Sequence, residues 1–146
     1  RKRGGKSDLV IVGTFMWRDE KMDEEGVHWV GRLEDEVLVS AIAGANALLY
    51  LPFFEGFGVP VVEAMACGVP VVASDTSSLP EVCGGAAAAL VNPNDFEGAA
   101  QALIDLEKDA IWFKEKSNAG ILRAGDFSWD KSAEKFSSII TDLLRS

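Results

Sequence analysis

With 146 residues, 48% of them hydrophobic, the chain is long enough for one ordinary domain with a single hydrophobic core. Acidic residues outnumber basic ones 23 to 14, and the net charge of −9 argues against a nucleic-acid interface or a patch for an anionic membrane. The two cysteines, Cys67 and Cys83, lie in apolar or glycine-alanine surroundings with no His or Cys at metal-ligand spacing. We therefore expect reduced core thiols, no bound metal and a cytoplasmic protein.

Two short apolar runs, each closed by a glycine, come first along the chain. Leu9–Gly13 and Val27–Gly31 both have the composition of a buried parallel strand. The charged segment between them, residues 18–25, is expected to be a loop or a short exposed helix. The only histidine, His28, falls in the second strand, where a strand-edge or core position explains it better than a role as catalytic base.

Residues 37–54 carry no charge over 18 positions, which on length alone approaches the threshold for a membrane span. The periodicity changes midway, however, and Pro52 and several polar residues interrupt the run. A helix that starts with the acids at 34–36 and ends at Gly44, followed by a strand over 47–51, explains the pattern better.

The tetrapeptide Val-Pro-Val-Val occurs twice, at 59–62 and at 69–72. Periodicity alone does not separate a short helix from a buried strand, so the neighbouring residues decide. The apolar residues 64–66 extend the first copy as a helix, whereas Gly68 and following polar residues bound the second copy as a strand.

Capping patterns predict where the next helices begin. Ser78 with Glu81 fits a capping box, which predicts a short helix. Residues 87–91 are expected to form a last, alanine-rich strand. Asn94 with Glu97 is a second capping pair, in front of a helix whose apolar stripe consists of Phe96, Ala99, Ala100, Leu103 and Ile104.

Two further helices are expected near the C-terminal end of the sequence. One covers residues 110–124, and Ser128 caps the other. The last helix carries an apolar face made of Trp129, Ala133, Phe136, Ile140, Leu143 and Leu144. The most direct explanation of the large aromatic residues in this region is a core or helix-interface position; they are Trp112, Phe113 and Trp129.

Strands that alternate with helices predict a mostly parallel sheet with helices on both faces, an open doubly wound α/β fold. Ligands of such folds bind at the carboxyl ends of strands. The segment 55–63 follows the strand predicted at 47–51, so we expect it to lie where a ligand would bind.

Two carboxylates bracket a glycine-rich entry into a predicted helix in the sequence Glu55-Gly56-Phe57-Gly58-Val59-Pro60-Val61-Val62-Glu63. The two glycines permit close backbone approaches, and the free N–H groups of a helix start attract a phosphate. Each carboxylate can accept hydrogen bonds from two neighbouring hydroxyls of a ribose or pyranose. Two plainer explanations are that the macrodipole alone favours Glu63 in the first helical turn and that Glu55 is a loop acid in water.

Residues 55–82, EGFGVPVVEAMACGVPVVASDTSSLPEV, resemble the C-terminal nucleotide-sugar-binding domain of retaining glycosyltransferases of the GT-B fold, group 1 (family 4). The two glutamates are similar to that family's E-x7-E motif. The likeness extends upstream through Val27–Gly31 and downstream through residues 127–129, so it covers nearly the whole chain. It implies that residues 1–146 are a single donor-binding Rossmann-like domain and a fragment of a two-domain enzyme.

The resemblance also implies an activity and a set of site residues. Members of the family transfer a hexose from a nucleoside diphosphate sugar to an acceptor with retention of configuration, without a cofactor and usually without a metal. By position, Glu55 resembles the catalytic residue that receives the hydroxyls of the donor sugar, and Glu63 resembles the ligand of the ribose hydroxyls. The other implied donor-binding positions are Gly56, Phe57, Gly58 and Val59 for the sugar and diphosphate, and Gly31, Arg32 and Leu33 for the base.

The chain departs from the family pattern in three respects. The family's domain usually opens with one more strand, central in the sheet, and a helix that carry an Arg and a Lys for the diphosphate. A gap is therefore expected here, unless another chain or a rearrangement fills it. The amino-terminal domain that holds the acceptor is also missing, so we expect the fragment alone to be inactive and its last helix to expose an apolar face that favours self-association. Phe53 stands where a serine is common, and alanines at 86–89 replace a segment that usually contains glycine.

Two other functions stay open at this point. A nucleotide-sugar 2-epimerase shares the fold, but Phe57-Gly58 followed by Pro60, and the run at 64–68, favour the transferase. A noncatalytic module, either a nucleotide-sugar sensor or a partner of an active subunit, is the second alternative, and both glutamates argue modestly against it. The expected partners are a nucleotide-sugar donor and an acceptor that is a sugar, a lipid or a polypeptide. The full-length protein is expected in the cytoplasm or at the membrane periphery.

Overall fold

The computed structural model describes residues 5–14 and 24–145, so most of the charged segment predicted at 18–25 lies outside the described residues. The strands are β1 (Leu9–Val12), β2 (Val27–Gly31), β3 (Leu48–Tyr50), β4 (Val71–Ser74) and β5 (Ala89–Val91). The helices are α1 (Asp35–Ala43), α2 (Val59–Ala66), α3 (Leu79–Cys83), α4 (Phe96–Lys108), α5 (Ala110–Ala124) and α6 (Trp129–Arg145).

Parallel pairing is the rule for the described strands. β1 pairs with β2, and β3, β4 and β5 form a second sheet in that order. The connections within the second sheet pass through α2 and then α3, because a parallel pair needs a long crossover. The predicted α/β class is confirmed, and so is the helix-then-strand explanation of the uncharged run at 37–54. Among the described residues, no helix combines the length and the apolarity needed to cross a bilayer.

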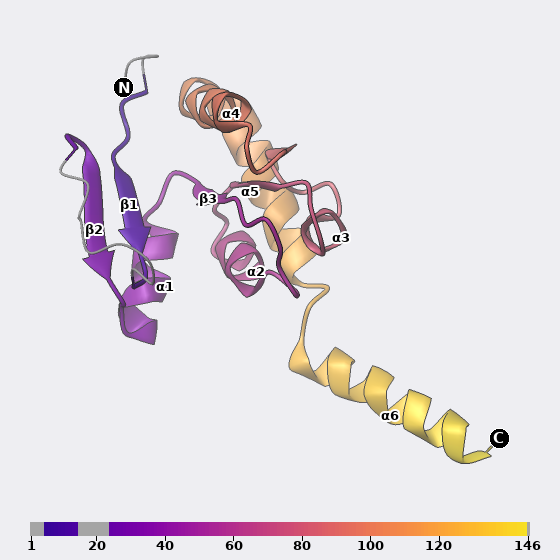
Figure 1. The fold of residues 1–146 in the computed structure, drawn as a ribbon. Helices are drawn as coiled ribbons and strands as arrows, with labels where there is room; N and C mark the ends of the chain where they lie inside the picture. Colours follow the sequence, from indigo (N-terminus) through magenta and orange to yellow (C-terminus); the bar gives the residue numbers. More distant parts are fainter. Residues whose placement is uncertain (1–4, 15–23, 146) are drawn as a thin grey trace.

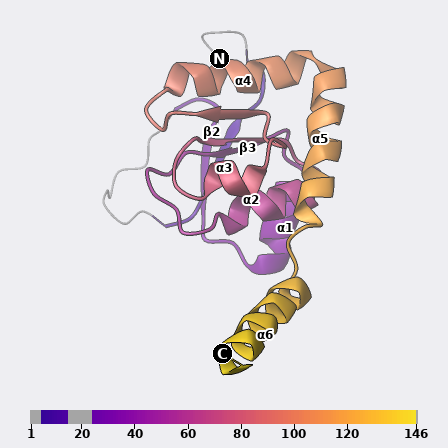
Figure 2. The ribbon, with the colours of Figure 1, turned by 90° about the vertical axis from the view of Figure 1, so that its right-hand side faces the viewer.

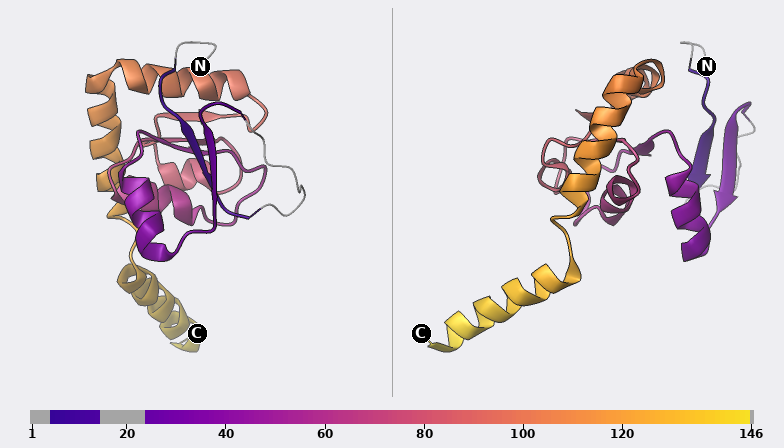
Figure 3. Two further views of the ribbon diagram at one scale, coloured as in Figure 1. Left: turned by 90° about the vertical axis from the view of Figure 1, so that its left-hand side faces the viewer. Right: turned by 180° about the vertical axis from the view of Figure 1, so that it is seen from behind.

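The described strands form two separate ladders and not one continuous sheet. No hydrogen-bonded ladder joins β1–β2 to β3–β4–β5 within residues 5–14 and 24–145. Figures 1 and 3 show β1 and β2 standing apart from β3. This division agrees with the gap expected in the sheet. Since little packs against β1, three of its apolar side chains stay more than two-fifths exposed, Leu9 at 43%, Val10 at 53% and Val12 at 41%.

Helices cover both faces of the second sheet, as in a doubly wound fold. Val71 and Ala73 of β4 belong to a core cluster with α2 and α3, whereas the intervening Val72 packs with apolar residues of α4. Every residue of β4 is buried, as predicted for a central parallel strand. Figure 2 shows α4 across one end of this core and α5 along its side. Both cysteines are free; Cys83 is buried, which raises its thiol pKa, and Cys67 is partly buried.

The beginning of α4 differs from the prediction by one residue. Asp95, not Asn94, is the N-cap, and its Oδ1 accepts a hydrogen bond of 2.9 Å from the backbone N–H of Gly98. Asn94 lies in the preceding turn, where its backbone N–H donates to Oδ1 of Asn92. Aspartate and asparagine are equally good N-caps, so the pattern alone does not rank them. The cap predicted for α6 is confirmed, because Ser128 Oγ accepts from the N–H of Lys131 at 3.1 Å.

The last helix, α6, projects away from the rest of the molecule (Figure 1). None of its described residues is buried. Trp129 is 91% exposed, so neither a core nor a helix-interface position is seen for it among the described residues, whereas Trp112 and Phe113 pack against the α4 cluster as predicted. The other exposed apolar residues of α6 are Phe136, Ile139, Ile140, Leu143 and Leu144. The exposed apolar face of α6 agrees with the expectation that the last helix leaves such a face uncovered.

Candidate functional site

Gly58 connects the loop after β3 to α2. It is the N-cap of α2, with φ 100° and ψ 44°, a backbone conformation that residues with a Cβ rarely adopt. A Cβ at this position would lie 2.6 Å from Cδ2 of Leu79. Gly56, in contrast, has open space around its Cα and no positive φ. The requirement for glycine therefore holds at Gly58 and not at Gly56.

Glu63 lies in the second turn of α2, because the helix begins at Val59. No acidic residue is in the first turn, so the explanation of Glu63 by the macrodipole of a first turn is wrong. Pro60 is in the first turn as predicted. The Glu63 side chain is exposed, and its carboxylate makes no hydrogen bond or ion pair to a described residue. Its oxygens are therefore available to a ligand.

Glu55 is held by three hydrogen bonds. Its Oε1 accepts from the backbone N–H of Gly56 at 2.9 Å and of Phe57 at 3.3 Å, and its Oε2 accepts from the hydroxyl of Tyr50. The Tyr50 hydrogen bond, followed by the loop N–H groups, lowers the pKa of Glu55, so the carboxylate stays ionised at neutral pH. Glu55 is thus not a free loop acid in water. It is an oriented carboxylate beyond the carboxyl end of β3.

Two residues from distant parts of the chain support this loop. Ser78 Oγ lies 3.1 Å from the carbonyl oxygen of Glu55 and 3.0 Å from that of Phe57, so its one O–H donates within reach of both acceptors. The ring of Phe127 meets the ring of Phe57 edge-on, with centroids 5.6 Å apart. Ser78 is at the N-cap of α3 but makes no capping hydrogen bond, so the predicted capping box is wrong. Its hydroxyl holds the loop instead, which the local pattern did not indicate.

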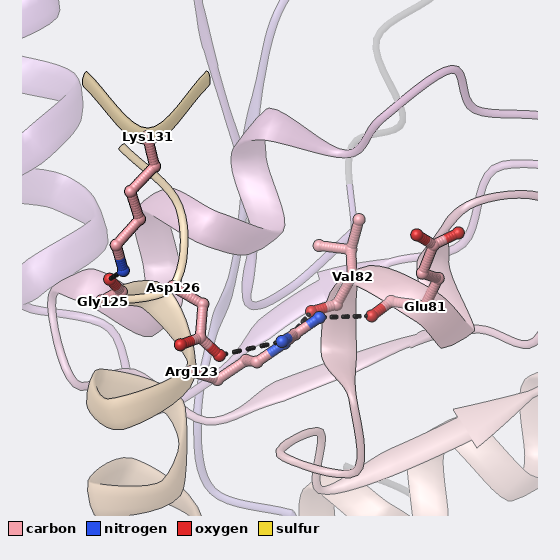
Figure 4. A network of polar contacts seen from close by, with 6 residues as sticks. All are labelled: Glu81, Val82, Arg123, Gly125, Asp126 and Lys131. Carbon is pink, nitrogen blue, oxygen red and sulfur yellow. Dashed lines mark hydrogen bonds and ion pairs between the residues drawn. The ribbon is translucent and has the colours of Figure 1, made fainter. Parts of the chain in front are cut away.

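Arg123 of α5 forms hydrogen bonds to the end of α3 (Figure 4). Its Nε donates to the carbonyl oxygen of Val82 at 2.9 Å, and its Nη2 donates to that of Glu81 at 2.7 Å. Its Nη1 pairs with Oδ2 of Asp126 at 2.9 Å, and the guanidinium lies 4.7 Å from the ring centroid of Phe127. Arg123 thus joins the end of α3 to the ring that packs on Phe57.

Replacing Arg123 by lysine should lower the free energy of unfolding by about 1–2 kcal/mol, because an ammonium keeps the charge but not the planar fork of donors. Urea denaturation measures the effect. The matched control is Arg145→Lys on the exposed α6, which should change stability by less than about 0.5 kcal/mol. Equal effects at the two positions would contradict the role of the Arg123 contacts.

The residues expected to contact the base, 31–33, lie at the end of β2, in the β1–β2 sheet. Gly31 ends β2 with φ 71°, Arg32 is exposed, and Leu33 is partly exposed. No hydrogen bond among the described residues joins these positions to the loop at 55–58. His28 lies on the exposed side of β2, with Nε2 2.9 Å from Oδ2 of Asp8. This placement agrees with the strand-edge explanation of His28.

Comparison with known proteins decides the family. The family model described as glycosyl transferases group 1 matches residues 1–109. The chain belongs to the group 1 glycosyltransferases. The O-antigen chain mannosyltransferase B of Escherichia coli is 36% identical over 130 residues, which are 84% of this chain and 34% of that protein. The MMP alpha-(1->4)-mannosyltransferase of Mycolicibacterium hassiacum is 38% identical over 110 residues, which are 73% of this chain and 27% of that protein.

Solved structures with a similar fold support the fold class. Sucrose-phosphate synthase from Thermosynechococcus elongatus superposes with a TM-score of 0.73 at 28% identity, over 83% of this chain and 31% of that one. HepE from Anabaena, solved in complex with UDP-glucose, superposes with a TM-score of 0.76 at 19% identity, over 92% of this chain and 41% of that one. The resemblance to the C-terminal domain of a GT-B glycosyltransferase is therefore confirmed. The chain spans roughly a quarter to a third of the length of the two mannosyltransferases, 27% and 34%.

Proposed function

We propose that the chain binds a nucleoside diphosphate sugar and is the donor-binding part of a retaining glycosyltransferase that transfers a hexose. The observation that carries this proposal is the pair of glutamates around the start of α2, with Glu55 oriented beyond β3 and Glu63 unpaired among the described residues. Two relatives named as mannosyltransferases and a fold neighbour solved with UDP-glucose support the substrate class.

Each part of the donor has a proposed position. The Glu55 carboxylate receives sugar hydroxyls and acts as the catalytic carboxylate, and the Glu63 carboxylate accepts from the two ribose hydroxyls. The start of α2 attracts the diphosphate, because the positive end of the helix dipole lies there. The backbone at 31–33 receives the base. Stabilising the departing diphosphate and positioning the sugar are the main catalytic tasks, so the proposal includes neither a resident metal nor a cofactor.

Transfer requires an acceptor as well as a donor. Because the chain matches only about a third of its mannosyltransferase relatives, we propose that catalysis also needs an acceptor-binding domain, and that the chain alone binds the donor without transferring the sugar. In that arrangement the protein acts in the cytoplasm or at the membrane periphery.

Calorimetric titration with GDP-mannose, UDP-glucose, GDP and UDP tests the proposal. Glu63→Ala should weaken binding of all four compounds by about 10-fold or more, because ribose is common to them and a charged hydrogen bond is lost. Glu55→Gln should weaken the two nucleotide sugars more than the two nucleotides, since only the former carry the hexose. The matched control is Glu115→Ala, an exposed acid on α5. Unchanged affinity in Glu63→Ala would rule out the ribose role.

A further inference from the structure

Tyr50 is the last residue of β3, and no role in donor binding has been assigned to it. Its backbone pairs with Ala73 in the neighbouring strand, and its partly buried ring packs against the core cluster formed by α2, α3 and β4. A tyrosine that is largely inside a protein needs a partner for its hydroxyl. The partner is Glu55, five residues further along the chain. The ring is therefore fixed by the core, and its hydroxyl is fixed at the loop.

The two oxygens of Glu55 have different kinds of partner. Oε1 accepts from the N–H groups of Gly56 and Phe57, which belong to the loop itself. Oε2 accepts from Tyr50, which belongs to the sheet. The Tyr50 hydroxyl is thus the contact that ties the direction of the carboxylate to the rigid part of the domain. Without it, the carboxylate could turn with the loop.

We propose that Tyr50 is a positioning residue, whose hydroxyl holds the Glu55 carboxylate in the direction needed to receive the donor sugar. This inference rests on the proposed function for its consequence, but the contact itself can be tested without a donor. A carboxylate that is already oriented loses less conformational freedom on binding, so the hydroxyl raises donor affinity without touching the donor.

The charges of the pair favour this role. Burial raises the pKa of Tyr50 to about 12, and the hydrogen bond to Glu55 adds to the increase. The same hydrogen bond is the largest cause of the lowered pKa of Glu55. The pKa of Tyr50 is raised and the pKa of Glu55 is lowered, so the proton stays on the phenol and the negative charge stays on the carboxylate throughout the neutral range. Glu55 is then an acceptor only, as the recognition of sugar hydroxyls requires.

The first experiment is an NMR titration of the Glu55 carboxyl group in the wild type and in Tyr50→Phe, which removes the hydroxyl and keeps the ring. Glu55→Gln identifies the Glu55 signal. The carboxyl pKa of Glu55 should be higher in Tyr50→Phe than in the wild type, because the main cause of its depression is gone. The matched control is Ser74→Ala, which removes a buried hydroxyl that donates to the carbonyl oxygen of Pro52 at 2.8 Å and does not touch Glu55.

In Ser74→Ala the carboxyl pKa of Glu55 should stay at its wild-type value. An equal pKa of Glu55 in the wild type and Tyr50→Phe overturns the proposal, and so does an equal rise in the two variants. Circular dichroism of each variant establishes that the fold is kept.

If Tyr50→Phe does not fold, the same contact is tested from the Tyr50 side, by measuring the pKa of Tyr50 in the wild type and in Glu55→Gln. Tyr50 is the only tyrosine in the chain, so tyrosinate absorbance reports its ionisation alone, and its pKa should fall when Glu55 loses its charge.

The second experiment measures GDP-mannose and UDP-glucose affinity in the same variants. Tyr50→Phe should weaken the better-bound donor by about three- to tenfold, and by more than Ser74→Ala does. A shifted pKa of Glu55 with unchanged donor affinity would mean that the contact forms but does not position Glu55 for the donor, which overturns the proposal. Binding of neither donor by the wild type would instead overturn the proposed function, and the titration would still decide whether Tyr50 orients Glu55.

Discussion

Gly58→Ala should lower the free energy of unfolding by about 2–5 kcal/mol. The substitution places a Cβ on a residue with φ 100°, which costs about 1–2 kcal/mol. It also puts that Cβ 2.6 Å from Cδ2 of Leu79, and overpacking of this kind costs about 1–3 kcal/mol. Urea denaturation followed by circular dichroism measures the loss.

The matched control is Gly56→Ala, two residues earlier in the same loop. Gly56 has no positive φ, and no described atom beyond its chain neighbours lies within 4 Å of the position that the added methyl group would take. Its substitution should change stability by less than about 0.5 kcal/mol, because no strain arises and the unfolded chain loses some freedom. Similar losses for the two variants would mean that the backbone of Gly58 is not strained as described.

Leu79→Ala should also be among the most destabilising single substitutions, at about 2–5 kcal/mol. Leu79 is fully buried in the core cluster beneath the loop, so truncation leaves a cavity where α3 meets the start of α2. The same urea measurement applies. The control is Leu122→Ala on α5, where the side chain is 78% exposed, and its effect should stay within about 0.5 kcal/mol.

The double variant separates the two costs at Gly58. In the background of Leu79→Ala the steric conflict with Cδ2 is gone, whereas the cost of the positive φ remains. Gly58→Ala should therefore cost about 1–2 kcal/mol there, and the two substitutions should not be additive. Additive losses would contradict a direct contact between the two side chains.

The Glu55 loop is where prediction from the sequence was least complete. The pattern located both glutamates and the helix start between them, because glycine, proline and acidic residues act locally in the chain. It did not find Tyr50 as the partner of Glu55, and it assigned Ser78 to a helix cap. Both errors concern side-chain hydroxyls, whose partners depend on which segments the fold brings together.

The amino-acid sequence by itself determined the order of helices and strands, the parallel α/β class and the positions of Glu55 and Glu63. These properties follow from periodicity and turn chemistry, which act over a few residues. Only the tertiary structure decided that Trp129 is exposed, that Asp95 caps α4, and that Tyr50, Ser78 and Phe127 hold the loop. Strand neighbours, burial and hydrogen bonds between distant residues depend on packing, and packing exists only once the chain has folded.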